Sequence, residues 1–225
     1  MNKKILASIF VIGILALAMG YGTYSYFSDT ETSTDNTFTA GTLHTALSND
    51  GVNWFVDVTH TWVSPSNWAP GEYVESKLYI RNDGTINVMH VAYEAYNLGG
   101  TGLADAVLLT KIVYTEGGVA YDVTDWFKVT AGMDVNSDGK ITLREFVDGW
   151  PYAMKFWTGA WGGSTEYLTA SGGNSQYLLL GFTFDSAAGN EYQGKTASFD
   201  LEVRAYQSWL QAPYIAKGAG CYGYA

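Results

Sequence analysis

Residues 134–145 carry oxygen-bearing side chains at a spacing that suits a bound calcium ion. The run reads Asp-Val-Asn-Ser-Asp-Gly-Lys-Ile-Thr-Leu-Arg-Glu, and it fits the EF-hand loop at every diagnostic position. Calcium is a hard cation that prefers about six to eight oxygen ligands. The positions that would supply them are Asp134, Asn136, Asp138, Lys140, Thr142 and Glu145. This pattern predicts a calcium site, with Ca2+ as the expected cofactor.

These positions differ in the oxygen atom that each would offer. Lys140 would contribute its backbone carbonyl, Thr142 could act through a water molecule, and Glu145 could bind bidentately. Gly139 permits the sharp turn that brings the first ligands together, and the apolar Ile141 is expected to point inward. The alternative interpretation is a solvated acidic turn without a bound ion.

The loop is expected to stand alone rather than as half of an EF-hand pair. A short helix is predicted from Thr142 to about Asp148, because Gly149 and Pro151 end the helical pattern. The sequence has no second loop to pair with. We therefore predict one structural calcium site inserted in another fold, for which weak affinity suffices outside the cell.

Other patterns with the spacing of catalytic or nucleotide-binding motifs are weaker. Residues 189–196 formally fit a phosphate-binding loop, but a strand pattern follows where that motif requires a helix. His44, His60 and His90 are too dispersed for the two-histidine motif of zinc proteases. Cys221 would act as a nucleophile only beside a base that the sequence does not identify. Because none of these motifs is complete, the sequence favours a protein that is not an enzyme.

The composition argues against nucleic acid as a partner and favours a folded domain. Among 225 residues, 12 are basic and 22 are acidic, which gives a formal charge of -10 without a basic stripe for phosphates. Apolar residues make up 47% and charged residues 15%, so one domain or two small ones can bury a large core. With one cysteine, no intrachain disulfide can form.

The N-terminus has the pattern of a secretory signal peptide. Lys3 and Lys4 form a positive region, and residues 5–19 are apolar without a charge. We expect cleavage after Ser25 or Tyr26, which makes the mature protein secreted, either extracellular or held at the cell surface. The alternative is a retained membrane anchor, because the apolar run is at the lower limit for a bilayer span.

Much of the remaining chain alternates apolar and polar residues with the period of two that is typical of β-strands. Residues 54–62 and 74–81 show this alternation, and residues 86–96 form another strand-like run. Asn82-Asp83-Gly84 has turn chemistry, so the second and third of these runs are expected to form a hairpin.

Four later runs extend the strand pattern to near the C-terminus. Residues 107–115 and 119–123 predict a second hairpin, and residues 176–184 and 197–206 predict two further strands. The inward-facing rows are expected to be Val74, Leu78 and Ile80 on one strand and Phe199, Leu201 and Val203 on another.

Seven or more strands with few helices predict an all-β fold, an antiparallel jelly-roll sandwich that carries the calcium loop and its short helix as an insertion. In chain order we expect a signal peptide (1–25), an N-terminal segment (26–43), the sandwich (44–210, with the loop at 134–145) and a Gly/Tyr-rich tail (211–225).

The segment from residue 27 to residue 43 is rich in Thr and Ser and poor in apolar residues. On its own the segment can bury few apolar side chains, so it gains most by pairing its backbone with an exposed sheet edge. When a neighbouring molecule supplies such a strand head to tail, the contact does not close and a filament grows. The alternatives are a flexible polar tail and an ordinary first strand of its own sandwich.

The run Phe27-Ser-Asp-Thr-Glu-Thr-Ser-Thr-Asp-Asn-Thr-Phe38-Thr-Ala-Gly-Thr-Leu43 resembles the start of mature proteins of the TasA/camelysin family. Residues 192–207, with a Gln-Gly turn and an Ala-Tyr-Gln end, are similar to that family's closing strand. The middle of the chain shows no such likeness. His44-Thr45 replaces the Asp-Leu that commonly follows in the family, and the calcium loop is an addition.

The resemblance implies a secreted jelly-roll subunit that polymerises into extracellular matrix fibres or bundling pili by donor-strand complementation, for biofilm matrix or cell-cell contact. The expected partner is a second copy of the chain, with neighbouring fibres or a cell surface as further contacts. Residues from about Phe27 to Ala40 would insert into the next subunit. The predicted polymerisation residues are Phe27, Phe38 as an anchor, Ala40, Gly41 where the chain leaves the groove, and Leu43.

Two other classes of function stay open. The aromatic content of 16% would also serve a monomeric carbohydrate-binding or adhesion module at the cell surface. A camelysin-like metalloprotease would need a ligand cluster assembled from residues far apart in the sequence.

Overall fold

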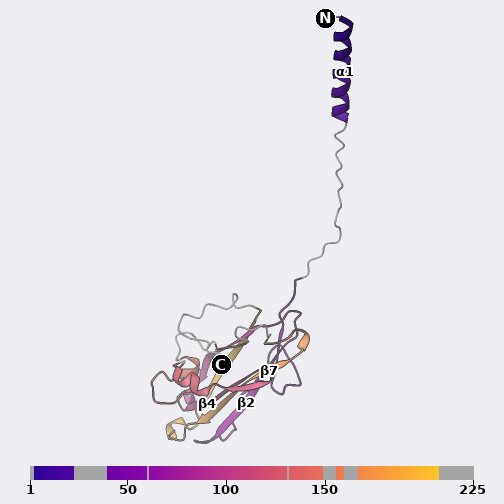
Figure 1. Cartoon of the computed structure of the whole chain (residues 1–225). Coiled ribbons are helices and arrows are strands. Elements are labelled where there is room, and N and C mark those ends of the chain that lie inside the picture. The colour runs from indigo at the N-terminus through magenta and orange to yellow at the C-terminus, as the bar shows by residue number, and fades with distance from the viewer. Residues whose placement is uncertain are drawn as a thin grey trace. The chain divides into compact units, whose positions relative to one another are not determined.

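The computed structural model describes residues 3–22, 40–59, 61–130, 132–148, 156–159 and 167–207 (Figure 1). The chain divides into two units, Met1–Thr39 and Ala40–Ala225. The first contains the helix α1 (Lys3–Gly22), which includes the apolar run of the predicted signal peptide. Over the part of the chain whose side chains are described, no helix is both long and apolar enough to cross a membrane.

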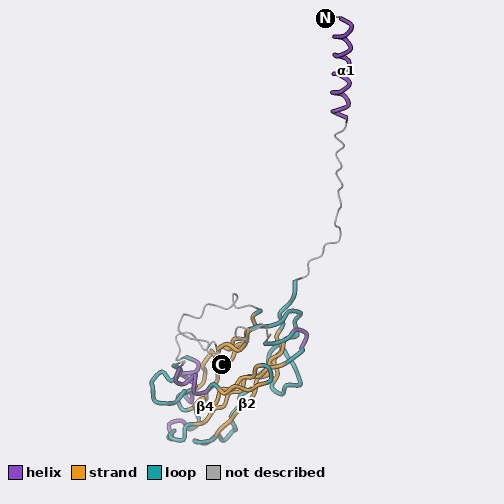
Figure 2. Tube along the Cα trace, in the orientation of Figure 1, coloured by secondary structure: helices purple, strands orange, loops and turns teal. Residues whose placement is uncertain are grey.

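The second unit contains two antiparallel sheets (Figures 1 and 2). The five-stranded sheet has the order β1 (Thr45–Ser48), β2 (Tyr73–Asn82), β7 (Ser175–Phe184), β4 (Val107–Glu116) and β5 (Val119–Asp122). The three-stranded sheet has the order β6 (Phe156–Gly159), β3 (His90–Gly100) and β8 (Ala197–Tyr206). All the paired strands are antiparallel, so the predicted all-β class is confirmed.

Short helical segments lie between the strands. The helix α2 (Leu143–Val147) has Thr142 as its N-cap and Asp148 as its C-cap, which confirms the helix expected at this place. The other described segments are three single 3-10 turns and one short π-helix. They are η1 (Leu103–Asp105), η2 (Trp126–Thr130), η3 (Ala170–Gly172) and η4 (Asn190–Tyr192).

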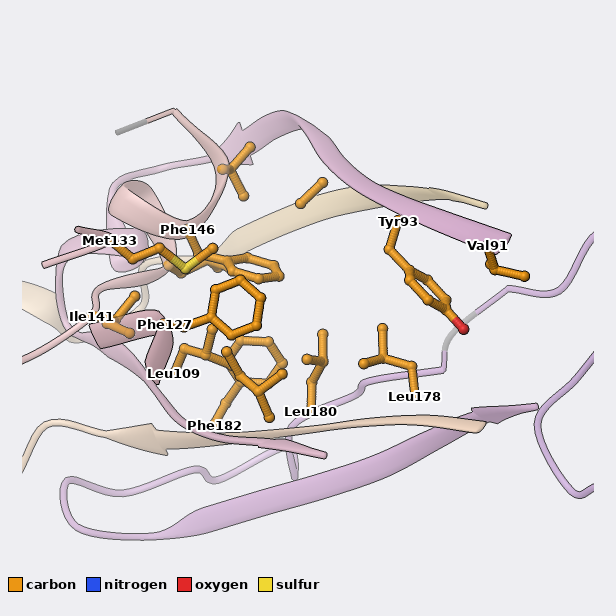
Figure 3. Close-up of a cluster of buried hydrophobic side chains, with 14 of the residues drawn as sticks. Val91, Tyr93, Leu109, Phe127, Met133, Ile141, Phe146, Leu178, Leu180 and Phe182 are labelled. Carbon is orange, nitrogen blue, oxygen red and sulfur yellow. The ribbon is translucent and has the colours of Figure 1, made fainter. Parts of the chain in front are cut away.

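The core lies between the two sheets (Figure 3). Tyr93 of β3 points from one sheet toward Leu178 and Leu180 of β7 in the other, and the side chains of all three are fully buried. Met133 and Phe146, from the segment after η2 and from α2, fill one end of the same cluster. Burying each such side chain contributes roughly 1.5 to 3 kcal/mol, so this cluster holds the two sheets together.

Aromatic rings join the two sheets at one side of the core. The ring of Phe199 on β8 lies 5.8 Å from that of Phe182 on β7, centroid to centroid. It also lies 5.9 Å from the ring of Phe146 in α2 and 6.0 Å from that of Trp62. Phe199 therefore contacts the opposite sheet, the helix and the segment before β2 at once, and the expected inward rows of β2 and β8 are confirmed.

The expected hairpin between residues 74–81 and 86–96 is wrong, because β2 and β3 belong to different sheets. The turn residues form a corner that carries the chain from one sheet to the other. The amides of Thr85 and Ile86 donate to the carbonyl of Thr42, and the side chain of Asn82 donates to the carbonyl of Ile86. A Cβ atom on Gly84 would lie 2.3 Å from the Thr42 carbonyl oxygen, so the corner requires glycine there.

The expected strand over residues 54–62 is also wrong. Of its described residues (54–59, 61 and 62), only Phe55 forms a bridge, to Leu47 of the four-residue strand β1, and Val56 is 68% exposed. Since β1 is so short, it offers no further partner for a ladder. Trp62 is instead directed into the core, and His60 of the expected row lies outside the described residues.

The other predicted strands are confirmed. The strands β4 and β5 pair as the expected hairpin, with Val113 opposite Asp122 and Glu116 opposite Val119. The runs predicted near the C-terminus are the strands β7 and β8.

Truncating the ring that joins the sheets is expected to destabilise the sandwich. Phe199→Ala should lower the free energy of unfolding by about 3 kcal/mol, because the contacts with three other rings are lost. Urea unfolding of the mature protein measures this, with Ser198→Ala on the opposite face of the same strand as a matched control. A loss below about 1 kcal/mol, or equal losses in both variants, would contradict the role given to Phe199.

Candidate functional site

The predicted calcium loop folds around its own acidic side chains. The carboxylate of Asp134 accepts hydrogen bonds from the amides of Asp138, at 3.0 Å, and Gly139, at 2.7 Å. Asn136 Oδ1 accepts from the Asp138 amide at 2.9 Å. Gly139 has a φ of 83°, in the left-handed region that the sharp turn requires. The first half of the loop is thus a tight turn with Asp134 at its centre.

Glu145 closes the second half of the loop. Its carboxylate accepts hydrogen bonds from the Thr142 amide, at 2.9 Å, and from the Asn136 amide, at 3.3 Å. Thr142 Oγ1 in turn accepts from the Glu145 amide, which completes a capping box at the start of α2. The Thr-x-x-Glu spacing was visible in the sequence as a sign of this box. Glu145 is only 8% exposed, so a buried carboxylate reaches across the loop from its third to its ninth position.

The loop is attached to the sandwich by its eighth and ninth positions. The carbonyl of Ile141 accepts a hydrogen bond from the Leu109 amide of β4 at 2.7 Å, and Thr142 bridges Leu108. The side chain of Ile141 is 2% exposed, which confirms its expected inward direction. Because Phe146 of α2 packs on Phe182, the end of the loop is fixed to the core as well as to a strand.

An ion pair that the sequence did not predict ties the loop to the end of β7. Lys140 Nζ lies 2.6 Å from Asp185 Oδ2, and this hydrogen bond lowers the pKa of the Asp185 carboxyl and raises that of the Lys140 ammonium. The two residues are 45 positions apart, so no local pattern could have joined them. Because an ammonium group has no acceptor atom, Lys140 can offer only its backbone carbonyl to a cation in the loop.

Among the described residues, no group of three or more His, Cys, Asp or Glu side chains is gathered closely enough to hold a metal ion. The carboxylates of Asp134 and Glu145 are hydrogen-bonded to amides of their own loop. Of the three histidines, His44 is exposed at the start of β1, His90 is completely buried in β3, and His60 lies outside the described residues.

The predicted polymerisation residues lie partly within the described chain. Gly41 packs so closely on Ile86 that a Cβ atom there would lie 2.3 Å from Ile86 Cγ2. Ala40 and Leu43 are on the exposed path that leads into β1, with Leu43 36% exposed. Phe27 and Phe38 lie outside the described residues.

Comparison with known families gives a match over the N-terminal part of the chain. Residues 1–103 match the family model described as camelysin metallo-endopeptidase. The predicted resemblance to the TasA/camelysin family is confirmed. The camelysin match covers α1 and the strands β1, β2 and β3, and the calcium loop lies beyond it. No curated protein matches the chain significantly.

The buried histidine predicts a pH dependence of stability near neutrality. Burial lowers the pKa of the His90 imidazole below its usual value of 6.5, so the unfolded chain binds a proton that the folded chain resists. This contribution is therefore complete above about pH 6.5 and is lost as the pH falls from there toward the folded pKa, by at most about 1.4 kcal/mol per pH unit.

Urea unfolding at pH 7.5, 6.5 and 5.5 measures this loss. We expect the wild type and the exposed-site variant His44→Gln to lose stability in parallel, whereas His90→Leu should show a smaller slope. Equal slopes in all three proteins would contradict the role of His90.

Proposed function

We propose that this protein is a secreted structural subunit that polymerises head to tail into extracellular fibres, with its N-terminal segment as the connecting strand. The observation that carries the proposal is the incomplete cover of the strand β2: within the described part of the chain, its residues 73–77 have no strand on one side. An open strand edge can accept a strand from a neighbour, and residues 27–40 are the segment that we propose for it. The match to the camelysin family, which the sequence links to TasA, supports the same conclusion.

The architecture that we propose for the subunit is a jelly-roll sandwich. Three features support it: the two facing antiparallel sheets, the passage of the chain from β2 to β3 between them, and the central position of β7, which comes late in the sequence. Such a sandwich leaves strand edges open, and open edges accept further strands.

We propose further that calcium stabilises the subunit through residues 134–145. The donor set consists of oxygen atoms only, which suits a hard cation. Asp134, Asn136, Asp138, the Lys140 carbonyl, Thr142 and Glu145 would hold the ion. Bound calcium would draw the carboxylates of the loop together and neutralise them, and the loop is attached to β4 and to the core. Calcium binding would in this way stabilise the sandwich itself.

A second candidate function is a carbohydrate-binding or adhesion module. Partly exposed aromatic residues lie beside cations at one end of the five-stranded sheet: Arg81 lies over the Trp54 ring, and Lys77 lies over the Tyr177 ring, each 4.4 Å from the centroid. A module of this kind would stay monomeric in size-exclusion chromatography. Proteolysis, the activity in the description of the matched family, is tested by incubation with casein in the presence and absence of a chelator.

Calcium is expected to raise the melting temperature of the mature protein. At a calcium concentration roughly 100-fold above the Kd, binding adds about 2.7 kcal/mol of stability. Glu145→Gln should abolish most of this gain, because Gln can retain the capping-box hydrogen bond but lacks the charge. Asp125→Asn, an exposed acidic position outside the loop, is the matched control. Equal melting temperatures in calcium and in chelator for the wild type would refute the calcium site.

Removing the connecting strand is expected to abolish polymerisation without unfolding the subunit. Mature protein lacking residues 27–40 should remain monomeric in size-exclusion chromatography, keep the circular dichroism spectrum of the full chain, and form no fibres by electron microscopy. Normal fibres from the truncated protein would rule out assembly through this segment.

A further inference from the structure

Half of β2 has no strand on one of its sides. The strand pairs with β7 from Tyr73 to Arg81, but on its other side β1 covers only Tyr79–Asn82. Within the described part of the chain, no strand lies beside residues 73–78 on that side. We call residues 73–77 of this strand the open edge of β2 (Figure 1).

The hydrogen-bond pattern identifies which backbone groups face outward there. Leu47 of β1 exchanges both of its backbone hydrogen bonds with Phe55, so its own groups point away from β2. The neighbouring pairs Ala46/Arg81 and Ser48/Tyr79 must then be the hydrogen-bonded ones, because the two kinds of pair alternate along an antiparallel ladder.

The backbone amide and carbonyl groups of the odd-numbered residues of β2 therefore point toward β1. The same alternation continues along the rest of the strand. The amide and carbonyl groups of Tyr73, Glu75 and Lys77 point past the end of β1. Among the described residues, no backbone hydrogen bond reaches them on that side. A strand placed there would find three donors and three acceptors in register.

The interior beside the open edge is already filled by an aromatic side chain. Trp62 Nε1 donates to the carbonyls of Ser76, at 3.0 Å, and Leu180, at 3.1 Å, while its ring stacks on Phe199. Further along, Trp68 packs on Phe184 with ring centroids 5.5 Å apart. An added strand therefore needs only small side chains on its inner face, since the two indoles occupy the space that larger ones would fill.

The N-terminal segment has the pattern that suits this edge. Along residues 28–34 the even positions are Ser or Thr, which are small and β-compatible. The acidic residues Asp29, Glu31 and Asp35 all fall at odd positions and so share the other face of an extended strand. With the small side chains inward, the three carboxylates would lie on the outer face of the five-stranded sheet.

Charge distinguishes the open edge of β2 from the edge of β8. Near the first, Lys77 and Lys111 accompany the carboxylate of Glu75, which lies 3.1 Å from Lys111 Nζ, and the carboxylate of Asp122 is close enough to act on Tyr73. The outer face of β8 and its neighbour β3 has three carboxylates, Asp200, Glu202 and Glu94, beside the guanidinium of Arg204. An acidic strand meets a more favourable charge at the first edge than at the second, where carboxylates outnumber the guanidinium.

We propose that the open edge of β2 is the acceptor for residues 28–35 of a second copy of this chain. The inference depends on the proposed function and assigns the partner surface of the same contact. The chain's own segment enters the sandwich where Gly41 packs on Ile86, beyond the Asn82 end of β2. The strand β1 lies between that point and the open edge, so a neighbouring molecule reaches the edge more directly.

Cross-linking between two tagged preparations tests the acceptor. In a Cys221→Ser background, one preparation carries Lys77→Cys and the other carries Cys in place of Glu31, Ser33 or Asp35, which scans the register. The two are mixed before assembly and treated with a short bis-thiol reagent. We expect covalent heterodimers from at least one pair, and markedly fewer when Asp200→Cys on β8 replaces Lys77→Cys.

Fibre formation without heterodimers at position 77, or with stronger cross-linking at position 200, would overturn the proposal while leaving polymerisation itself intact. Failure of the proposed function has a different result, namely fibres that form without residues 27–40.

A charge reversal tests the electrostatic part of the argument. Lys77→Glu is expected to slow assembly about tenfold at low salt, and Glu31→Lys in the same chain should restore part of the rate. Lys195→Glu, an equal change of charge near the start of β8, is the matched control. Equal assembly rates for Lys77→Glu and Lys195→Glu, with unchanged melting temperatures, would overturn the assignment of this edge.

Discussion

The contact between the inner faces of the two sheets is the interaction on which the rest of the structure depends. Each sheet buries one row of side chains against the other, and the rings of Phe182 and Phe199 meet across the gap. Neither sheet has its own apolar partner, so each is stable only when the other is in place. The chain has one cysteine, which leaves packing as the force that joins the sheets.

The same contact determines where the acidic loop can be placed. Phe146 of α2 extends the aromatic cluster, and Ile141 and Met133 anchor the segment before it in the core. The exposed half of the loop is therefore carried by a rigid base. Without the buried apolar residues below it, a turn with this many charges would have few contacts that hold it in one conformation.

The sequence predicted those parts of the fold that depend on neighbours along the chain. The strand pattern identified β4, β5, β7 and β8, and the helical pattern that Gly149 and Pro151 end gave α2. It failed where a distant residue decides the conformation. The turn after β2 had ordinary hairpin chemistry, but its amides bond to Thr42, more than 40 residues earlier. In the candidate site, the twelve loop positions were read locally, whereas the partner of Lys140 could be found only from the folded chain.

The attachment of residues 40–44 beside the corner at Gly84 has a mechanical consequence. The carbonyl of Thr42 accepts two amides, that of His44 accepts the amide of Asp83, and the Thr42 amide donates to Thr85 Oγ1. These bonds lie side by side, so tension applied through Ala40 along the chain loads them together and not one after another. A subunit held in a fibre by this segment would resist pulling through a shear contact, and its lifetime under load would depend on the rate at which that contact opens.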